Sequence, residues 1–167
     1  MGVSAAGKST VGAALAAVLG VPFEDADDLH PAPNRGKMAA GIPLVDEDRW
    51  PWLDAVGERF REQRSSGLVL ACSALRRTYR DRIRRHEADV VFVHLHGTRD
   101  LLAARAASRT GHFMPAALLA SQLETLEPLE SDERGLTADV STPAEELATD
   151  IAGRLVATGR APAQSLR

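Results

Sequence analysis

Apolar residues recur at helical spacing in several stretches of the chain, and short apolar runs separate these stretches. Positions 11, 14, 15, 18 and 19 are apolar, which predicts a helix that ends at Gly20 and Pro22. The same criterion predicts helices that begin near residues 48, 73, 98 and 118 and after residue 142. Short runs at 21–24, 68–72, 90–95 and 136–140 predict strands. Strands that alternate with helices predict an α/β fold with a parallel sheet covered by helices on both faces.

Local signals place several of the helix starts. Pro51 falls in the first turn of a helix that would begin at Asp48. Thr98, with Asp100 in the first turn, is expected to open the next helix. The segment Thr142–Glu145 has the pattern of a capping box with proline at the first helical position.

Length and charge limit the classes of protein that need to be considered. With 167 residues, the chain fits one domain, which we expect over residues 1–157, followed by a disordered tail at 158–167. Twenty Lys and Arg against 23 Asp and Glu give a formal net charge of −3, which offers no general basic surface for nucleic acid.

The cysteine content and hydropathy indicate the compartment. Cys72 is the single cysteine, so the chain has no internal disulfide framework and fits a reducing compartment. Its apolar strand context favours a core residue over a nucleophile. No apolar run approaches the roughly 20 residues that cross a bilayer. We therefore expect a soluble cytoplasmic protein without a membrane partner.

The strongest chemical pattern lies in the first ten residues. Gly2 and Gly7 enclose four residues and are followed by Lys8 and Ser9, which is the spacing of a phosphate-binding loop. Such a loop holds phosphate with its backbone N–H groups and with the N-terminal end of the following helix. Lys8 is expected to reach the β- and γ-phosphate oxygens, and Ser9 to bind Mg²⁺. The predicted nucleotide site comprises Gly2, Val3, Ser4, Ala5, Ala6, Gly7, Lys8, Ser9 and Thr10.

Two features of this stretch are irregular. Ala5 stands where many phosphate loops have glycine, and its narrower range of backbone conformations predicts weakened phosphate binding. A phosphate loop is also expected to follow a buried strand, yet only Met1 precedes Gly2. Loss of about four buried apolar residues at roughly 2 kcal/mol each would remove about 8 kcal/mol. We therefore expect that the first strand is missing and that the natural chain begins further upstream.

Acidic residues follow the first predicted strand. Asp25, Asp27, Asp28 and His30 lie just past its end, where open α/β sheets bind their ligands. Asp25 and Asp27 alternate with Ala26, so they would face the same side of an extended segment. Phosphoryl transfer needs one carboxylate near Mg²⁺ and another near the accepting hydroxyl. The alternative is a solvated acidic turn.

Several basic residues are candidates for binding an anion. Arg35 and Lys37 either serve an anion or lie exposed on a surface helix. Arg49 is either a substrate ligand or the salt-bridge partner of the acidic residues 46–48. Arg76 follows a strand end closely enough to face the site. The remaining arginines of this basic helix are expected to be solvated: Arg80, Arg82, Arg84 and Arg85.

A mobile lid is predicted in the second half of the chain. Arg105 and Arg109 lie four residues apart and share one helix face. The loop 111–115 follows directly, so we place the lid at about residues 109–125. Lids of this kind bring arginine to the transferring phosphoryl group and exclude water.

Nine short motifs follow one another along the chain, at residues 2–10, 25–31, 37–38, 41–44, 48–49, 51–53, 72–75, 79–81 and 111–114. This ordered set closely resembles the gluconokinases over residues 2 to about 155. The resemblance implies ATP-dependent phosphorylation of D-gluconate to 6-phospho-D-gluconate, in a dimeric P-loop kinase fold related to shikimate kinases. Two alternatives remain: another small-molecule P-loop kinase, such as a shikimate-kinase-like enzyme, or a catalytically impaired nucleotide-binding protein.

The resemblance also implies roles for single residues. Lys8 and Ser9 would hold phosphate and Mg²⁺, with Asp25 near the metal, while Asp27 would orient or deprotonate the acceptor hydroxyl. The implied substrate ligands are Asp27, His30, Lys37, Arg49, Arg76 and His112. Arg105 and Arg109 would lie on the nucleotide side, with Lys8, Asp27 and Arg109 as the catalytic set. The chain departs from the family at Ala5-Ala6, where Gly-Ser is usual, and at Gly36.

Overall fold

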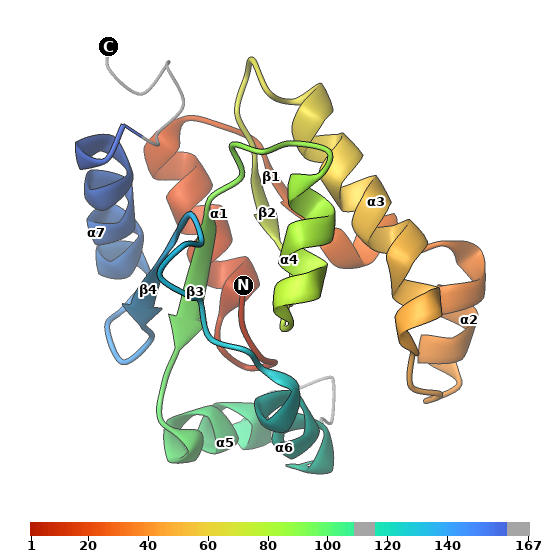
Figure 1. The fold of residues 1–167 in the computed structure, drawn as a ribbon. Coiled ribbons are helices and arrows are strands. Elements are labelled where there is room, and N and C mark those ends of the chain that lie inside the picture. Colours follow the sequence, from red (N-terminus) through yellow and green to blue (C-terminus); the bar gives the residue numbers. More distant parts are fainter. Residues whose placement is uncertain (109–115, 160–167) are drawn as a thin grey trace.

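Short parallel strands lie at the centre of the structure, with helices around them (Figure 1). The computed structural model describes residues 1–108 and 116–159. In chain order the elements are α1 (Lys8–Leu19), β1 (Phe23–Asp25), the 3₁₀ helix η1 (Ala26–Leu29), α2 (Ala32–Ala39), α3 (Asp46–Glu62), β2 (Val69–Ala71), α4 (Arg77–Arg84), β3 (Phe92–His96), α5 (Arg99–Ser108), α6 (Ala116–Thr125), β4 (Gly135–Asp139) and α7 (Ala144–Ala157).

The described strands pair in two parallel couples. β1 pairs with β2, and Phe23 lies opposite Val69. β3 pairs with β4, and Phe92 lies opposite Gly135. The predicted α/β fold with parallel strands is confirmed, although the described strands form two two-stranded sheets and not one continuous sheet.

Met1 and Gly2 connect the two couples. The amino group of Met1 donates to the carbonyl of Val93, and its carbonyl accepts from the N–H of Leu95 at 2.9 Å. On the other side, the N–H of Gly2 donates to the carbonyl of Ser73 at 3.1 Å. The start of the chain therefore lies between β2 and β3, where a strand ahead of the phosphate loop would run.

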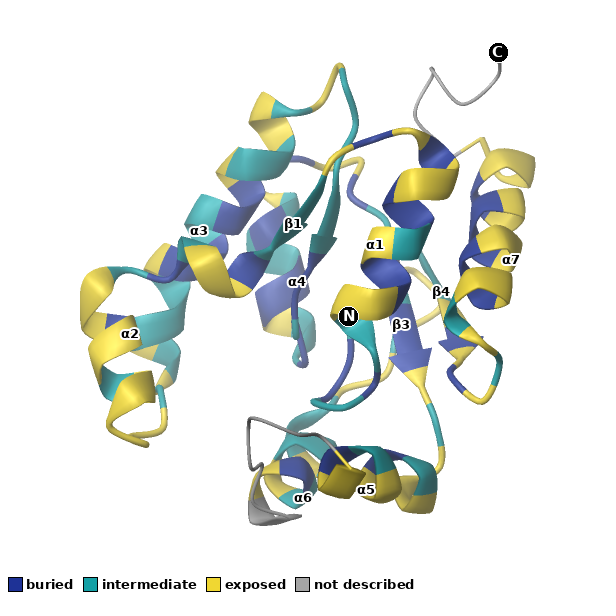
Figure 2. Ribbon diagram, turned by 180° about the vertical axis from the view of Figure 1, so that it is seen from behind, coloured by how far each residue is buried: buried dark blue, intermediate teal, exposed yellow. Residues whose placement is uncertain are grey.

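Helices cover both faces of the strands. α1 and α7 pack together on one face, and α4, with α3 beside it, lies on the other (Figures 1 and 2). Each face has its own cluster of buried apolar side chains. The first cluster includes Leu15, Leu19, Leu95, Ile151 and Leu155, and the second includes Trp52, Leu53, Val56, Ile83 and Phe92.

α5 and α6 lie beyond the carboxyl end of β3, next to the loop that precedes α1 (Figure 2). Thr98 opens α5 as predicted, because its hydroxyl accepts from the N–H of Leu101 at 3.3 Å. None of the helices in the described part of the chain is both long and apolar enough to span a bilayer.

Two helix starts differ from the prediction. α3 begins at Asp46, so Pro51 lies inside the helix and not in its first turn. The earlier start is stabilised by the side chain of Asp48, which accepts from the N–H of Val45 at 3.1 Å. The first turn also has three carboxylates, which interact favourably with the positive end of the helix dipole.

The capping box predicted for α7 does not form. Pro143 itself is the cap residue, and no side chain caps the helix. The backbone N–H of Thr142 donates to the carbonyl of Asp139 at 3.4 Å, so Thr142 belongs to the turn that follows β4. Two glutamates in the first turn of α7 supply the favourable negative charge instead.

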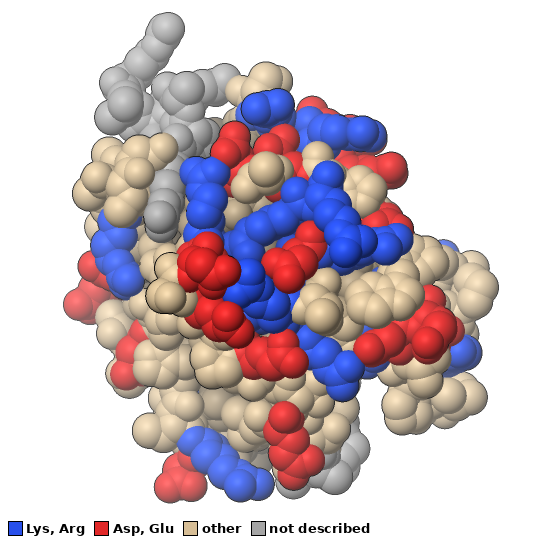
Figure 3. Space-filling model, in the orientation of Figure 1, with Lys and Arg blue, Asp and Glu red and all other residues tan. Residues whose placement is uncertain are grey.

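The arginines of α4 lie among carboxylates (Figure 3). Arg82 pairs with Asp54 at 2.5 Å, and Arg77 pairs with Asp132 at 2.7 Å. The prediction that Arg80 is solvated is wrong: its side chain is 0% exposed and donates to Glu133 at 2.6 Å. The surface over this helix is therefore a mixture of both charges and not a basic patch.

Candidate active site

The loop of residues 2–7 turns tightly between Met1 and α1. Gly2 has a φ of 140°, and a Cβ atom there would lie 2.6 Å from the carbonyl oxygen of Leu95. Gly7 has a φ of 82° and precedes the first residue of α1. Both glycines of the predicted motif thus occupy conformations that a side chain would strain. The following helix directs its N-terminal end at this loop, which makes it a ready anion site.

Ala5 occupies the left-handed region as well, with a φ of 63°. For a residue that carries a Cβ atom, this conformation costs roughly 1–2 kcal/mol. Ala5 therefore adopts a conformation in which alanine is less favourable than the glycine found in many phosphate loops.

Two side chains contact the backbone of this loop. Lys8 Nζ donates to the carbonyl of Val3 at 3.0 Å. Gln122 Oε1, from α6, accepts from the N–H of Ser4 at 2.6 Å. The sequence analysis missed Gln122. The signal that could have found it is its position as a polar residue on the same face of α6 as the buried Leu119. The contact links the predicted lid region to the phosphate loop.

The residues predicted to hold Mg²⁺ lie together. Ser9 Oγ donates to Asp25 Oδ2 at 3.0 Å, and Asp25 Oδ1 accepts from the N–H of Asp27 at 3.1 Å. A hydroxyl and a carboxylate at the end of a phosphate loop are hard oxygen donors, which Mg²⁺ prefers. Among the described residues, no group of three or more His, Cys, Asp or Glu gathers for a metal ion. The donor set fits an ion that also binds phosphate oxygens.

Asp27 and His30 form the next part of the site. The side chain of Asp27 is 72% exposed, and its carboxylate lies 4.0 Å from His30 Nε2. Partial desolvation and the neighbouring Asp25 raise the pKa of Asp27. His30 is buried, stacks on Trp52 at 4.3 Å between ring centroids, and has its pKa lowered by burial. Trp52 in turn donates to the carbonyl of Ala26 at 2.7 Å, which holds the acidic turn.

Two arginines gather around one carboxylate, that of Asp46. Arg76 donates to Asp46 Oδ2 at 2.9 Å, and Arg49 donates to Asp46 Oδ1 at 3.4 Å. Both guanidinium groups lie 5.7 Å from the ring centroid of Tyr79, whose hydroxyl also donates to Asp46. The charge of Arg49 also acts on His30, so this cluster borders the acidic turn. The sequence indicated Arg49 as a possible partner of Asp46, but not Arg76 and Tyr79, which lie 30 and 33 residues further along the chain.

The remaining predicted site residues have other partners or fall outside the described part. Lys37 Nζ forms a close ion pair with Asp48 at 2.7 Å. Arg105 donates to the carbonyl of Val140 at 2.7 Å, beside the turn after β4. Arg109 and His112, together with the loop 111–115, lie outside the residues that the structure describes. The tail predicted for 158–167 overlaps the described chain only at 158 and 159.

Comparison with known proteins identifies the family. The family model described as "Shikimate kinase" matches residues 4–152. A probable gluconokinase of Xenopus tropicalis is 42% identical over 172 residues, which cover 93% of this chain and 90% of that protein. The chain belongs to the gluconokinase family. The resemblance found in the sequence is thereby confirmed.

Solved structures of related proteins support the same fold. A gluconokinase from Sinorhizobium meliloti has a TM-score of 0.82 and 46% identity, and the match covers 95% of this chain and 94% of that one. A sugar kinase from a Janibacter species has a TM-score of 0.85 and 44% identity, with 98% and 94% of the two chains covered. This gluconokinase family member therefore has the P-loop kinase fold predicted from its sequence.

Proposed function

We propose that this chain transfers the γ-phosphoryl group of ATP to a hydroxyl of D-gluconate and forms 6-phospho-D-gluconate. The observation that carries this proposal is the set of charged groups near His30. The carboxylate of Asp27 lies 4.0 Å from His30 Nε2, the charge of Arg49 also acts on His30, and Arg76 shares the carboxylate of Asp46 with Arg49. Gluconate has the matching chemistry, a carboxylate at one end and hydroxyls along the rest of its length.

The phosphate loop accounts for the nucleotide. Its backbone N–H groups and Lys8 would hold the phosphates, and Ser9 and Asp25 would hold Mg²⁺. A bound magnesium ion neutralises charge on the phosphates. These residues position the donor, which is the main task of the protein in phosphoryl transfer.

Asp27 is proposed to orient the acceptor hydroxyl and to take up its proton. Its raised pKa makes it a better proton acceptor than an ordinary aspartate. Its exposed carboxylate projects from the same turn as Asp25, close to the phosphate loop. The adjacent His30 is held by its stack on Trp52 and can serve as a hydrogen-bond partner for a substrate hydroxyl.

Arg49 and Arg76 are proposed to bind the sugar-acid carboxylate. In this structure both pair with the carboxylate of Asp46, which supports the proposal that they can bind a carboxylate. Guanidinium groups suit this task because their fixed geometry matches two carboxylate oxygens. Lys37 is proposed to contribute to the same substrate, for which it would leave Asp48. Arg105 and Arg109 are proposed to contact the nucleotide, and His112 is proposed to reach the substrate from the lid.

ADP release with Mg²⁺-ATP tests the proposal, with D-gluconate and shikimate as parallel acceptors. Lys8→Ala should abolish turnover. Asp27→Asn should lower kcat about 100-fold or more and leave ATP affinity nearly unchanged. Asp28→Asn is the matched control, because Asp28 is an exposed carboxylate on the same turn, and it should retain activity. A preference for shikimate, or ATP binding without ADP release with any sugar acid, would overturn the assignment.

We further propose that the protein acts as a cytoplasmic homodimer without a nucleic-acid or membrane partner. The family resemblance supports the dimer, and the net charge of −3 with a single cysteine supports the rest. Light scattering on the purified chain would measure the mass directly.

A further inference from the structure

Arg76 stands at the N-cap position of α4, but its side chain does not cap the helix. Serine, threonine, aspartate and asparagine are preferred there, because their side chains accept a hydrogen bond from the backbone N–H groups of the first turn. Arginine has no acceptor atom and cannot make this bond. The side chain of Arg76 instead reaches Asp46, where it donates to Oδ2 at 2.9 Å. The first turn of α4 therefore needs an acceptor from elsewhere in the chain.

Glu127 supplies this acceptor from the loop that follows α6. Its Oε2 accepts from the backbone N–H of Arg77, the first residue of α4, at 2.5 Å. A carboxylate at this point also interacts favourably with the positive end of the helix dipole. Because Arg77 and Glu127 lie 50 residues apart in the sequence, only the folded chain brings them together.

The backbone of Glu127 holds the other side of Arg76. The N–H of Glu127 donates to the carbonyl of Leu75 at 2.8 Å. Glu127 thus bonds to the residue before Arg76 through its backbone and to the residue after Arg76 through its side chain. The two bonded groups belong to the peptide units on either side of the Arg76 Cα atom, so one residue fixes both.

The segment that leads to Arg76 has an unfavourable backbone conformation. Ala74 has a φ of 39°, in the left-handed region that is costly for a residue with a Cβ atom. Arg80 Nη1 donates to the carbonyls of Ala74 and Leu75, at 3.3 Å in each case. Strained conformations persist where the surrounding structure holds them, and they cluster at ligand sites. The bonds of Arg80 and Glu127 are such a surrounding structure for the segment that carries Arg76.

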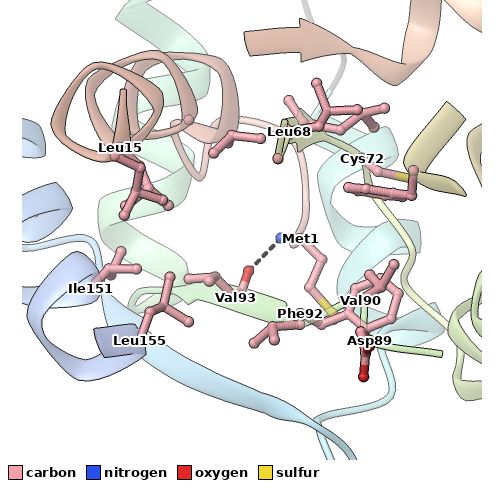
Figure 4. A pocket seen from close by; sticks show the side chains of 18 of the residues that line it. Met1, Leu15, Leu68, Cys72, Asp89, Val90, Phe92, Val93, Ile151 and Leu155 are labelled. Atoms are coloured by element: carbon pink, nitrogen blue, oxygen red, sulfur yellow. Dashed lines mark hydrogen bonds between the residues drawn. The ribbon is translucent and has the colours of Figure 1, made fainter. Parts of the chain in front are cut away.

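These bonds lie apart from the cavity that β2 and β3 line. That cavity has a volume of about 540 Å³, and Met1 and Cys72 are among its lining residues (Figure 4). Leu75, Arg76 and Glu127 do not line it. The bonds of Glu127 therefore act on the segment beyond the end of β2, at the acceptor side of the active site, and not on the packing around the cavity.

We propose that Glu127 is a positioning residue for Arg76 and, through it, for the carboxylate of the acceptor. This inference rests on the proposed role of Arg76 in binding D-gluconate. When both neighbouring peptide units are held, the guanidinium group loses less conformational freedom on binding a carboxylate. Without the Glu127 side chain, the N–H of Arg77 bonds to water, and Arg76 samples more orientations.

A helix cap without a positioning role would give a different result. Loss of a cap lowers stability, but it does not distinguish the acceptor from ATP. Removing only the side chain of Glu127 leaves its backbone bond to Leu75 and the bond from Arg80 to its carbonyl, at 3.0 Å. α6 therefore keeps its attachment, and Gln122 keeps its bond to the phosphate loop. The ATP side of the site should not change.

Three variants of the full chain test the proposal: Glu127→Ala, Glu127→Gln and Glu130→Ala. Glu130 is the matched control, because it is an exposed carboxylate of the same loop that also pairs with Arg77. Its partner is the guanidinium group, at 2.9 Å, and not the backbone N–H. The glutamine variant keeps an oxygen acceptor at the same distance from the backbone. ADP release gives kcat and the KM values for D-gluconate and ATP, and urea unfolding gives the midpoint of each variant.

Glu127→Ala should raise the KM for D-gluconate about tenfold, whereas the KM for ATP should change less than about twofold. Glu127→Gln should recover most of this loss, and Glu130→Ala should behave as the unmodified chain. An equal rise in both KM values would overturn the proposal, as would equal effects of Glu127→Ala and Glu130→Ala. A change confined to the urea midpoint would also overturn it and leave Glu127 as a helix cap.

A measurement without catalysis separates this inference from the proposed function. Nitrogen NMR relaxation at Nε of Arg76 reports the order of its side chain, and Arg76→Lys identifies the signal. Glu127→Ala should make this group more mobile, whereas Glu130→Ala should not. If the unmodified chain releases no ADP with D-gluconate, the proposed function fails. Unchanged relaxation in Glu127→Ala would overturn the positioning role, whichever acceptor the enzyme uses.

Discussion

Replacing Arg80 by leucine should remove a large part of the stability of this protein. The Arg80 side chain is 0% exposed, and its two bonds to Glu133 are 2.6 Å long. Arg80 also donates to four backbone carbonyls, those of Ala74, Leu75, Glu127 and Pro128, at 3.0–3.3 Å. Without Arg80, the buried Glu133 keeps Arg84, at 3.1 Å, as its ion-pair partner. Breaking a buried pair from one side costs about 3–5 kcal/mol.

The pH dependence of stability gives an independent measure of the same pair. Burial alone would raise the pKa of Glu133, but the hydrogen bonds from Arg80 and from the backbone outweigh it and lower the pKa from 4.5 to about 2. A carboxyl group whose pKa falls on folding stabilises the protein at pH values above the pKa that the group has in the unfolded chain. This stability is lost as the pH falls from about 4.5 towards 2. The difference corresponds to about 3 kcal/mol.

Urea unfolding of a double-mutant cycle is the assay. Arg80→Leu and Glu133→Leu should each lower the free energy of unfolding by about 3–5 kcal/mol, while the double variant should lose clearly less than their sum. Arg85→Leu is the control, because Arg85 is exposed at the end of the same helix. A loss below about 1 kcal/mol for Arg80→Leu, with additive effects in the double variant, would refute this reasoning.

Three further predictions concern single positions. Ala5→Gly should relieve the left-handed strain and raise the free energy of unfolding by up to about 1 kcal/mol. Ala6→Gly, at a buried position, should lower the free energy of unfolding. Urea unfolding compares the two variants, and a change in the same direction for both would contradict the strain argument. Gln122→Ala should lower kcat/KM for ATP roughly fivefold, because the hydrogen bond to the phosphate loop is lost. Ser121→Ala, at an exposed position, should leave kcat/KM unchanged. The same kcat/KM for both variants would show that Gln122 does not belong to the site. Burial raises the pKa of Cys72 to about 11, so its thiol should resist alkylation at pH 8 until urea unfolds the chain; rapid labelling of the folded protein would contradict this.

Most of the fold prediction rested on local patterns in the sequence. The helix that follows the phosphate loop ends at Gly20, which has a φ of 67°, as its position after the last apolar residue indicated. The strand predicted at 68–72 exists, but β2 is shorter than the apolar run and only partly buried. Val69 and Leu70 line a cavity of about 540 Å³ beside this strand and are partly exposed.

The sequence did not predict the contacts between distant segments. Arg80 belongs to a run of arginines, a pattern that predicts a surface position, whereas its burial depends on Glu133, which lies 53 residues away. Asp46 likewise gains its role only when Arg76 and Tyr79 fold against it. By contrast, Ser9, Asp25 and Asp27 were recognisable because the loop motif and the acidic turn each have a local pattern and the fold brings the two together.

The two apolar clusters on opposite faces of the strands affect how unfolding should be followed. Both tryptophans, Trp50 and Trp52, belong to the cluster packed by α3 and α4, and the other cluster has none. Tryptophan fluorescence therefore reports on one half of the molecule, whereas far-ultraviolet circular dichroism reports on the helices of both. If the two halves melt separately, the two signals will give different midpoints, and a single unfolding free energy will not describe the protein. Coincident curves from both probes would show that the two halves unfold in one cooperative step.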